Sequence, residues 1–143
     1  MSEDNSRVPP SERFLRKHTL PEEIDAASHE IIGAAIEVHR VLGPGYLEKI
    51  HEAALADELE LRNVGFSRQV PMIVPYKDLR ITGQQADLMV EPGIVVELKA
   101  VDRILPIHEA QVLSYLKSTG CRLGLLINFE VELLKNGLKR IVN

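Results

Sequence analysis

The segment Ile94–Ala100, with the sequence IVVELKA, constrains the fold more than any other part of the chain. Its β-branched residues favour an extended strand, in which successive side chains point to opposite faces. Glu97 and Lys99 therefore share one face, and Val96 and Leu98 share the other. Two opposite charges within an apolar strand are costly to desolvate unless other groups compensate for the lost water. Because a metal ion and an anionic substrate would provide that compensation, the segment predicts a functional site.

Length and composition indicate a soluble globular protein of one domain. The chain has 143 residues, of which 45% are hydrophobic, enough for a real core. No apolar run approaches the roughly 20 residues that a membrane helix needs, so we expect no membrane partner. The first residues lack the basic and apolar regions of a secretory signal. The single cysteine, Cys121, excludes an internal disulfide and suits a reducing compartment, so we expect a cytoplasmic protein.

The charge of the chain does not by itself suggest a nucleic-acid partner. The net charge is −4 and the isoelectric point is near 5.7. Proteins that depend on non-specific phosphate contacts are usually basic. A nucleic-acid substrate must therefore be argued from the site.

The hydrophobic pattern divides the chain into an N-terminal arm and one α/β domain. Residues 1–20 are polar and contain Pro9 and Pro10, so we expect a flexible arm, followed by a domain over residues 21–143. Apolar residues at helical spacing predict helices over residues 21–41, 46–63 and 107–118. Alternating or continuously apolar segments, bounded by turn residues, predict strands over residues 66–76, 79–90, 94–101, 122–128 and 138–142.

The connections between these segments predict how the strands pair. Short turns join the first three strands, which favours an antiparallel meander. The helix over residues 107–118 joins two strands as a crossover, so those strands should be parallel. The second helix presents an acidic side that includes Glu52, which we expect to face solvent. The result is a mixed sheet with helices packed against it.

Four groups of side chains are candidates for a common site. Carboxylates on neighbouring strands are a usual way to hold Mg²⁺, which would polarise a phosphodiester and lower the pKa of a bound water. A lysine beside them would stabilise developing negative charge. A glutamine and a tyrosine one helical turn apart share a helix face. The four groups are Glu48, Asp87, Glu97 with Lys99, and Gln111 with Tyr115.

Each group also has an ordinary structural interpretation. A Glu and a Lys two residues apart on a strand are most often a solvated ion pair. Glu48 is also an acid of the kind that the helix dipole favours near a helix start, and Asp87 suits a turn or an edge strand. Gln111 and Tyr115 could simply cover the sheet. The ordered set carries more information than any single member.

The order of these groups resembles the PD-(D/E)XK nuclease superfamily: a helix Glu, a strand Asp, a Glu-x-Lys strand and a following helix with Gln-x-x-x-Tyr. The last element is similar to that of the superfamily's recombination-exonuclease branch. More closely, the chain resembles the small GxxExxY proteins over nearly everything after residue 25. The matching segments are LGPGYLE (42–48), ADLMV (86–90), VELKA (96–100), HEAQVLSYL (108–116) and LLINF (125–129).

The resemblance implies an α/β, restriction-endonuclease-like fold, in which helices flank a mixed β-sheet core. It also implies that Glu48, Asp87 and Glu97 bind the metal, and that Lys99 is the catalytic lysine. The main-chain carbonyl of Leu98 would assist in metal binding.

Two further features of the chain are interpreted through the same resemblance. Gln111 and Tyr115 match the auxiliary pair that helps to place the substrate or the lysine. His51 stands where the name GxxExxY has a tyrosine. Because this position is not a metal ligand in the family pattern, the difference leaves the core chemistry unchanged.

The first functional hypothesis is a nuclease that uses Mg²⁺ or Mn²⁺ to hydrolyse DNA or RNA. A second is a non-catalytic nucleic-acid-binding or assembly protein that keeps the nuclease fold, which the acidic isoelectric point favours. A third is a hydrolase of nucleotides or other small phosphate compounds, which would need no large basic groove. So small a protein could gain nucleic-acid surface by forming a homo-oligomer, with residues 1–20 as a tether.

Overall fold

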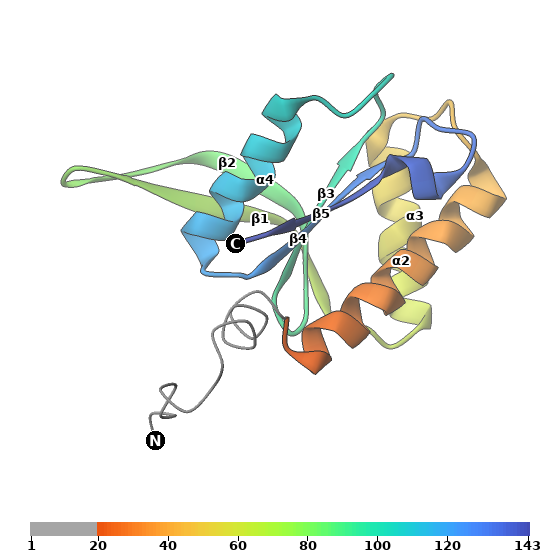
Figure 1. Cartoon of the computed structure of the whole chain (residues 1–143), viewed down its shortest axis with the longest axis horizontal. Helices are drawn as coiled ribbons and strands as arrows, with labels where there is room; N and C mark the ends of the chain where they lie inside the picture. Colours follow the sequence, from red (N-terminus) through yellow and green to blue (C-terminus); the bar gives the residue numbers. More distant parts are fainter. Residues whose placement is uncertain (1–19) are drawn as a thin grey trace, which may run out of the picture.

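The structure, a computed structural model, describes residues 20–143. The predicted arm over residues 1–20 lies outside the described residues except for Leu20, which packs against the core. The elements, shown in Figure 1, are α2 (Glu22–Leu42), α3 (Glu48–Leu61), β1 (Phe66–Tyr76), β2 (Leu79–Val90), β3 (Ile94–Lys99), α4 (Pro106–Thr119), β4 (Leu123–Asn128), a 3₁₀ helix η2 (Leu134–Gly137) and β5 (Leu138–Val142).

The five strands form one mixed sheet in the order β1-β2-β3-β4-β5. The pairs β1–β2, β2–β3 and β4–β5 are antiparallel. Strands β3 and β4 are parallel, as predicted from the crossover through α4. The expected α/β fold with a mixed sheet flanked by helices is confirmed.

The helices cover opposite faces of the sheet (Figure 1). Helices α2 and α3 pack on one face, where Ile31 and Leu55 meet the strand residues Val96 and Leu98. Helix α4 covers the other face, where Tyr115 and Leu116 pack with a smaller cluster that includes Val95, Met72 and Ala86. The alternation predicted for β3 is therefore correct, because Val96 and Leu98 both belong to the α2–α3 side.

Two glycines separate the first two described helices. Gly43 and Gly45 have φ values of 71° and 99°, which L side chains rarely adopt. They separate α2 from α3, so that α3 begins at Glu48 and not at the predicted residue 46. Among the described residues, no helix combines the length and the hydrophobicity needed to span a membrane.

Candidate active site at the separation of β2 and β3

The centre of the site is the point where β2 and β3 stop pairing. Their ladder runs from Val90 opposite Ile94 to Leu88 opposite Val96. At the next position, side chains replace the main-chain ladder. The Asp87 main-chain N–H donates to Glu97 Oε1 at 3.0 Å, and the Leu98 N–H donates to Asp87 Oδ2 at 2.8 Å. Each carboxylate thus binds the backbone of the opposite strand, and the two carboxylates lie side by side.

The environment of Glu97 disfavours its charge. The residue is 4% exposed, and this burial, together with the neighbouring charge of Asp87, raises the pKa of Glu97 to about 8. The Asp87 N–H and the Lys99 ammonium act in the opposite direction but do not offset the rise. Below about pH 8 this environment disfavours the state in which both carboxylates are ionised. At neutral pH the pair therefore holds a proton, and a bound cation would take the place of that proton.

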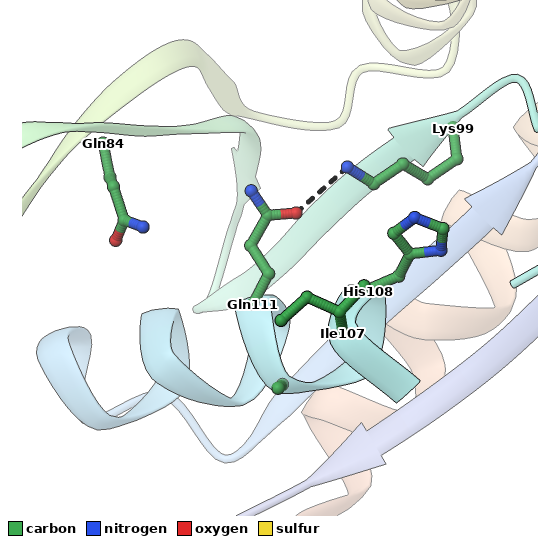
Figure 2. Close-up of a pocket in the computed structure, with 6 residues that line it drawn as sticks. Gln84, Lys99, Ile107, His108 and Gln111 are labelled. Atoms are coloured by element: carbon green, nitrogen blue, oxygen red, sulfur yellow. Dashed lines mark hydrogen bonds between the residues drawn. The ribbon is translucent and has the colours of Figure 1, made fainter. Parts of the chain in front are cut away.

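Lys99 is held by a chain of hydrogen bonds to α4. Its Nζ lies 4.0 Å from Glu97 Oε2. The same Nζ donates to Gln111 Oε1 at 3.0 Å, as Figure 2 shows. The Gln111 Nε2 in turn donates to the Tyr115 hydroxyl at 3.0 Å. Because an ammonium group can only donate, the Gln111 oxygen must face Lys99 and its nitrogen must face Tyr115. The predicted pairing of Gln111 with Tyr115 on one helix face is borne out in the geometry.

Burial also affects Tyr115, which is 2% exposed. Its burial, and secondly the charge of Glu97, raise the pKa of the phenol. Tyr115 therefore stays neutral and serves as a hydrogen-bonding group for Gln111.

An open pocket of about 470 Å³ adjoins Lys99, lined by Gln84, Lys99, Ile107, His108, Ala110 and Gln111. In Figure 2 the lysine and Gln111 lie on one side of it and Gln84 of β2 on the other. The Leu105 N–H donates to His108 Nδ1 at 2.9 Å, so the proton of the neutral ring is on Nε2. His108 thus caps the start of α4.

Comparison of the sequence with models of protein families shows which family has this domain. The family model of the PD-(D/E)XK nuclease superfamily matches residues 25–141. The chain belongs to this superfamily. Its members are usually nucleases, and they generally use divalent metal ions. A nucleic-acid substrate is therefore implied at the level of the superfamily.

A solved structure supports the same fold for this PD-(D/E)XK protein. The chain is similar to the one described as "Crystal structure of SSO0001", with a TM-score of 0.53 and 20% sequence identity. The similarity covers 66% of this chain and 49% of the other, so it spans about half the length of that protein. At this identity the likeness shows the fold alone. A comparison with curated protein sequences gives no match.

The structure does not bring Glu48 to the carboxylate pair of this PD-(D/E)XK domain. Glu48 is the first residue of α3 and is exposed. Among residues 20–143, no three His, Cys, Asp or Glu side chains are grouped closely enough to hold a metal ion. The assignment of Glu48 as a metal ligand stays a prediction, and the geometry places only Asp87 and Glu97 together.

The acid of α3 that connects to the site is Glu52. We expected Glu52 to face solvent, and this was wrong: the residue is 7% exposed. Its carboxylate accepts from Arg68 at 2.8 and 3.1 Å and from Gln69 Nε2 at 2.7 Å. Gln69 Nε2 also lies 3.3 Å from Asp87 Oδ1. No pattern within α3 signals this burial, because the groups that satisfy Glu52 come from β1.

His51, for which the sequence predicted no metal-binding role, has a packing role. It is fully buried, and its ring stacks on Phe129 with centroids 4.4 Å apart. Its Nε2 hydrogen-bonds to the carbonyl of Gly43 at 3.0 Å, whereas Nδ1 has no partner. His51 therefore ties the break between α2 and α3 to the residue that follows β4.

Proposed function

We propose that this protein is a metal-dependent nuclease that hydrolyses phosphodiester bonds of DNA or RNA. The observation that supports this most directly is the carboxylate pair of Asp87 and Glu97 with Lys99 Nζ 4.0 Å from Glu97 Oε2. Carboxylates for a cation and an ammonium group for a phosphate are the groups this reaction needs. Within the superfamily, we further propose that the chain is one of the GxxExxY proteins.

The residues of the site fit a divalent cation. Burial and mutual repulsion disfavour the doubly ionised pair, and hard cations such as Mg²⁺ and Mn²⁺ prefer oxygen ligands of this kind. Asp87 and Glu97, with the Leu98 carbonyl, would hold the ion. When bound, it supplies Lewis-acid activation of the phosphodiester and of the attacking water.

Lys99 provides the positive charge for the scissile phosphate. Its side chain is 17% exposed and borders the pocket, so a phosphate there replaces little water around the ammonium group. One N–H is directed to Gln111, and the others remain for the attacking water or a phosphate oxygen. Because charge develops on the phosphate oxygens in the transition state, a fixed ammonium group stabilises that state most.

Gln111 and Tyr115 orient the lysine before substrate arrives. Lysine has a flexible stem with several rotatable bonds, and the Gln111 oxygen selects one of its orientations. The bond to the Tyr115 hydroxyl prevents the Gln111 amide from turning over. Pre-organisation of this kind lowers the barrier because less reorganisation is needed during the reaction.

The test is a cleavage assay with labelled single- and double-stranded DNA and RNA in Mg²⁺, Mn²⁺ or EDTA. We expect Lys99→Ala to lower the cleavage rate by about 100- to 1000-fold, and cleavage to need the metal. Lys117→Ala is the matched control, because Lys117 is an exposed lysine of α4. If wild type binds metal by calorimetry but leaves every polymer intact, the nuclease proposal is wrong. Turnover of nucleotides would then favour a small-phosphate hydrolase.

A non-catalytic assembly protein is a second candidate, favoured by the hairpin of β1 and β2. The hairpin projects from the body of the protein (Figure 1). Val74 pairs with Ile81 and Tyr76 with Leu79, so the four apolar side chains share one face, and all are exposed. A second copy of the chain offers the same uncharged face, which suits a symmetric dimer.

The two candidates differ in their response to changes in this hairpin. For an assembly protein, Leu79→Lys combined with Ile81→Lys should reduce the sedimentation coefficient, whereas Lys99→Ala should not change it. A wild-type protein that sediments as a monomer would exclude assembly through this face.

A further inference from the structure

Gln69 of β1 has a backbone conformation that is unusual for its residue type. Its φ is 49°, in the left-handed region that non-glycine residues seldom occupy within a strand. The conformation reverses the direction in which β1 side chains point. Phe66 packs with the α2–α3 cluster and Arg68 binds Glu52 of α3, whereas Val70 packs with the α4 cluster.

In the neighbouring strand β2, the side chains also switch faces of the sheet, at the residue beside Gln69. In β2, Leu88 belongs to the α2–α3 cluster, and Ala86 belongs to the α4 cluster. Asp87 lies between them, as Gln69 lies between their pairing partners Arg68 and Val70. Gln69 and Asp87 are therefore adjacent at the position where the side chains of β1 and β2 switch from one face of the sheet to the other. This is also the position where β2 stops pairing with β3.

The side-chain amide of Gln69 connects two carboxylates. Its Nε2 donates to Glu52 Oε1 at 2.7 Å and approaches Asp87 Oδ1 at 3.3 Å. Glu52 is held from its other side by Arg68, whose Nε and Nη2 both reach Oε2. An amide nitrogen carries two hydrogens, so one group can serve both acceptors. Being neutral, it adds no charge that would compete with a cation.

We propose that Gln69 is a positioning residue that fixes the carboxylate of Asp87, with the buried Glu52 and its partner Arg68 as the anchor of the Gln69 amide. One Asp87 oxygen is engaged by the Leu98 N–H at 2.8 Å, and the amide of Gln69 engages the other. Together they set the rotation of the carboxylate about its Cβ–Cγ bond. The role in metal binding rests on the proposed function, whereas the role in orienting Asp87 does not.

The backbone conformation of Gln69 and the hydrogen bonds of its side-chain amide can be tested separately. Glycine adopts the left-handed conformation without steric cost, so Gln69→Gly keeps the backbone conformation and removes the side chain with its amide. If Gln69 served the chain reversal alone, the glycine variant would behave as wild type. If the amide positions Asp87, the backbone stays intact but Asp87 gains freedom to rotate.

The experiment measures hydrogen exchange of individual amides by NMR in metal-free protein. The Leu98 amide reports on Asp87, because Asp87 Oδ2 is its acceptor. We expect Gln69→Gly to accelerate Leu98 exchange by about tenfold, which is the change that a loss of about 1.4 kcal/mol in local opening free energy produces. The amide of Val96, in the regular part of the β2–β3 ladder, should change by less than about twofold. Gln85→Gly is the matched control, since Gln85 is an exposed glutamine of β2.

A second measurement addresses the metal. Calorimetric titration with Mn²⁺ should show an affinity about 10- to 100-fold lower in Gln69→Gly than in wild type, the effect typical of residues that orient metal ligands. Cleavage should lose kcat with KM unchanged. If the Leu98 amide of Gln69→Gly exchanges at the same rate as in wild type, the proposal is overturned. If Leu98 exchange is accelerated in Gln69→Gly but the wild-type protein cleaves no substrate, Gln69 keeps its positioning role and the nuclease proposal is rejected. Should Gln69→Gly not fold, Gln69→Asn, which also tolerates this conformation and holds its amide one methylene group closer to the backbone, takes its place.

Discussion

Replacing Glu97 by glutamine tests the electrostatics of the carboxylate pair directly. Glutamine keeps an oxygen that can accept the Asp87 N–H. Its amide nitrogen can donate to the Asp87 carboxylate, as the hydroxyl of a protonated carboxyl group can. It has no charge at any pH. The substitution therefore removes the ionisation of Glu97 while it preserves the shape and hydrogen bonds of the site.

The magnitude follows from the pKa of Glu97. The folded state raises it from an ordinary 4.5 to about 8, so between these pH values the folded protein holds a proton that the unfolded chain has released. Wild-type stability therefore falls as the pH rises from 4.5 to 8. At about 1.36 kcal/mol for each pKa unit, the rise corresponds to about 5 kcal/mol as an upper limit. Because Asp87 shares the proton, we expect about 2–5 kcal/mol.

The assay is urea unfolding at pH 5 to 9 in EDTA. The free energy of unfolding of Glu97→Gln should equal that of wild type near pH 5 and exceed it by about a few kcal/mol at pH 8 to 9. That difference is a large part of the roughly 5–15 kcal/mol by which a domain is typically stable. Saturating Mg²⁺ should stabilise wild type at high pH and narrow the difference, because a bound cation replaces the proton. Glu60→Gln, at an exposed position of α3, controls for a general loss of surface charge. A difference between Glu97→Gln and wild type that does not change with pH would refute this reasoning.

Substitutions at two further positions test the support around the site. Tyr115→Phe removes the hydroxyl that accepts from Gln111, so we expect cleavage to slow about fivefold, equivalent to about 1 kcal/mol, in single-turnover assays; an unchanged rate would show that the Gln111 amide needs no second partner. His51→Ala removes the ring stacked on Phe129 and should cost about 2–4 kcal/mol in urea unfolding. His51→Phe retains the ring and should cost about 1 kcal/mol or less, and equal losses in the two variants would contradict a packing role.

The elements could be predicted from local patterns because local chemistry determines them. The strands β1, β2 and β5 have the predicted bounds, and α2 and α4 differ from prediction by one residue at each end. Proline and glycine mark their limits, and apolar spacing marks their buried faces. The parallel pairing of β3 with β4 followed from the crossover rule, which depends on chirality and not on particular side chains.

The connections across the site could not be predicted in the same way. Glu52 was expected to be exposed because its own helix offers no reason to bury it; Arg68 and Gln69, which satisfy it, come from β1. The left-handed φ of Gln69 has no signal in the sequence, since glycine or asparagine is the usual residue there. Both features depend on tertiary contacts that local periodicity does not encode.

The separation of β2 from β3 explains how a charged pair can lie inside an apolar sheet. Regular pairing would leave the Asp87 and Glu97 carboxylates without donors, but the separation exposes one N–H of each strand, and each carboxylate takes one of them. The side-chain oxygen of Gln111 likewise provides the partly buried ammonium group of Lys99 with a hydrogen-bond acceptor. What these bonds do not compensate is the burial of Glu97 and the repulsion between the two carboxylates, which together raise the pKa of Glu97. A fold selected for stability alone would relieve that repulsion with an amide in place of one carboxylate. Its retention beside an open pocket and an oriented lysine is consistent with a site whose remaining partner is a cation.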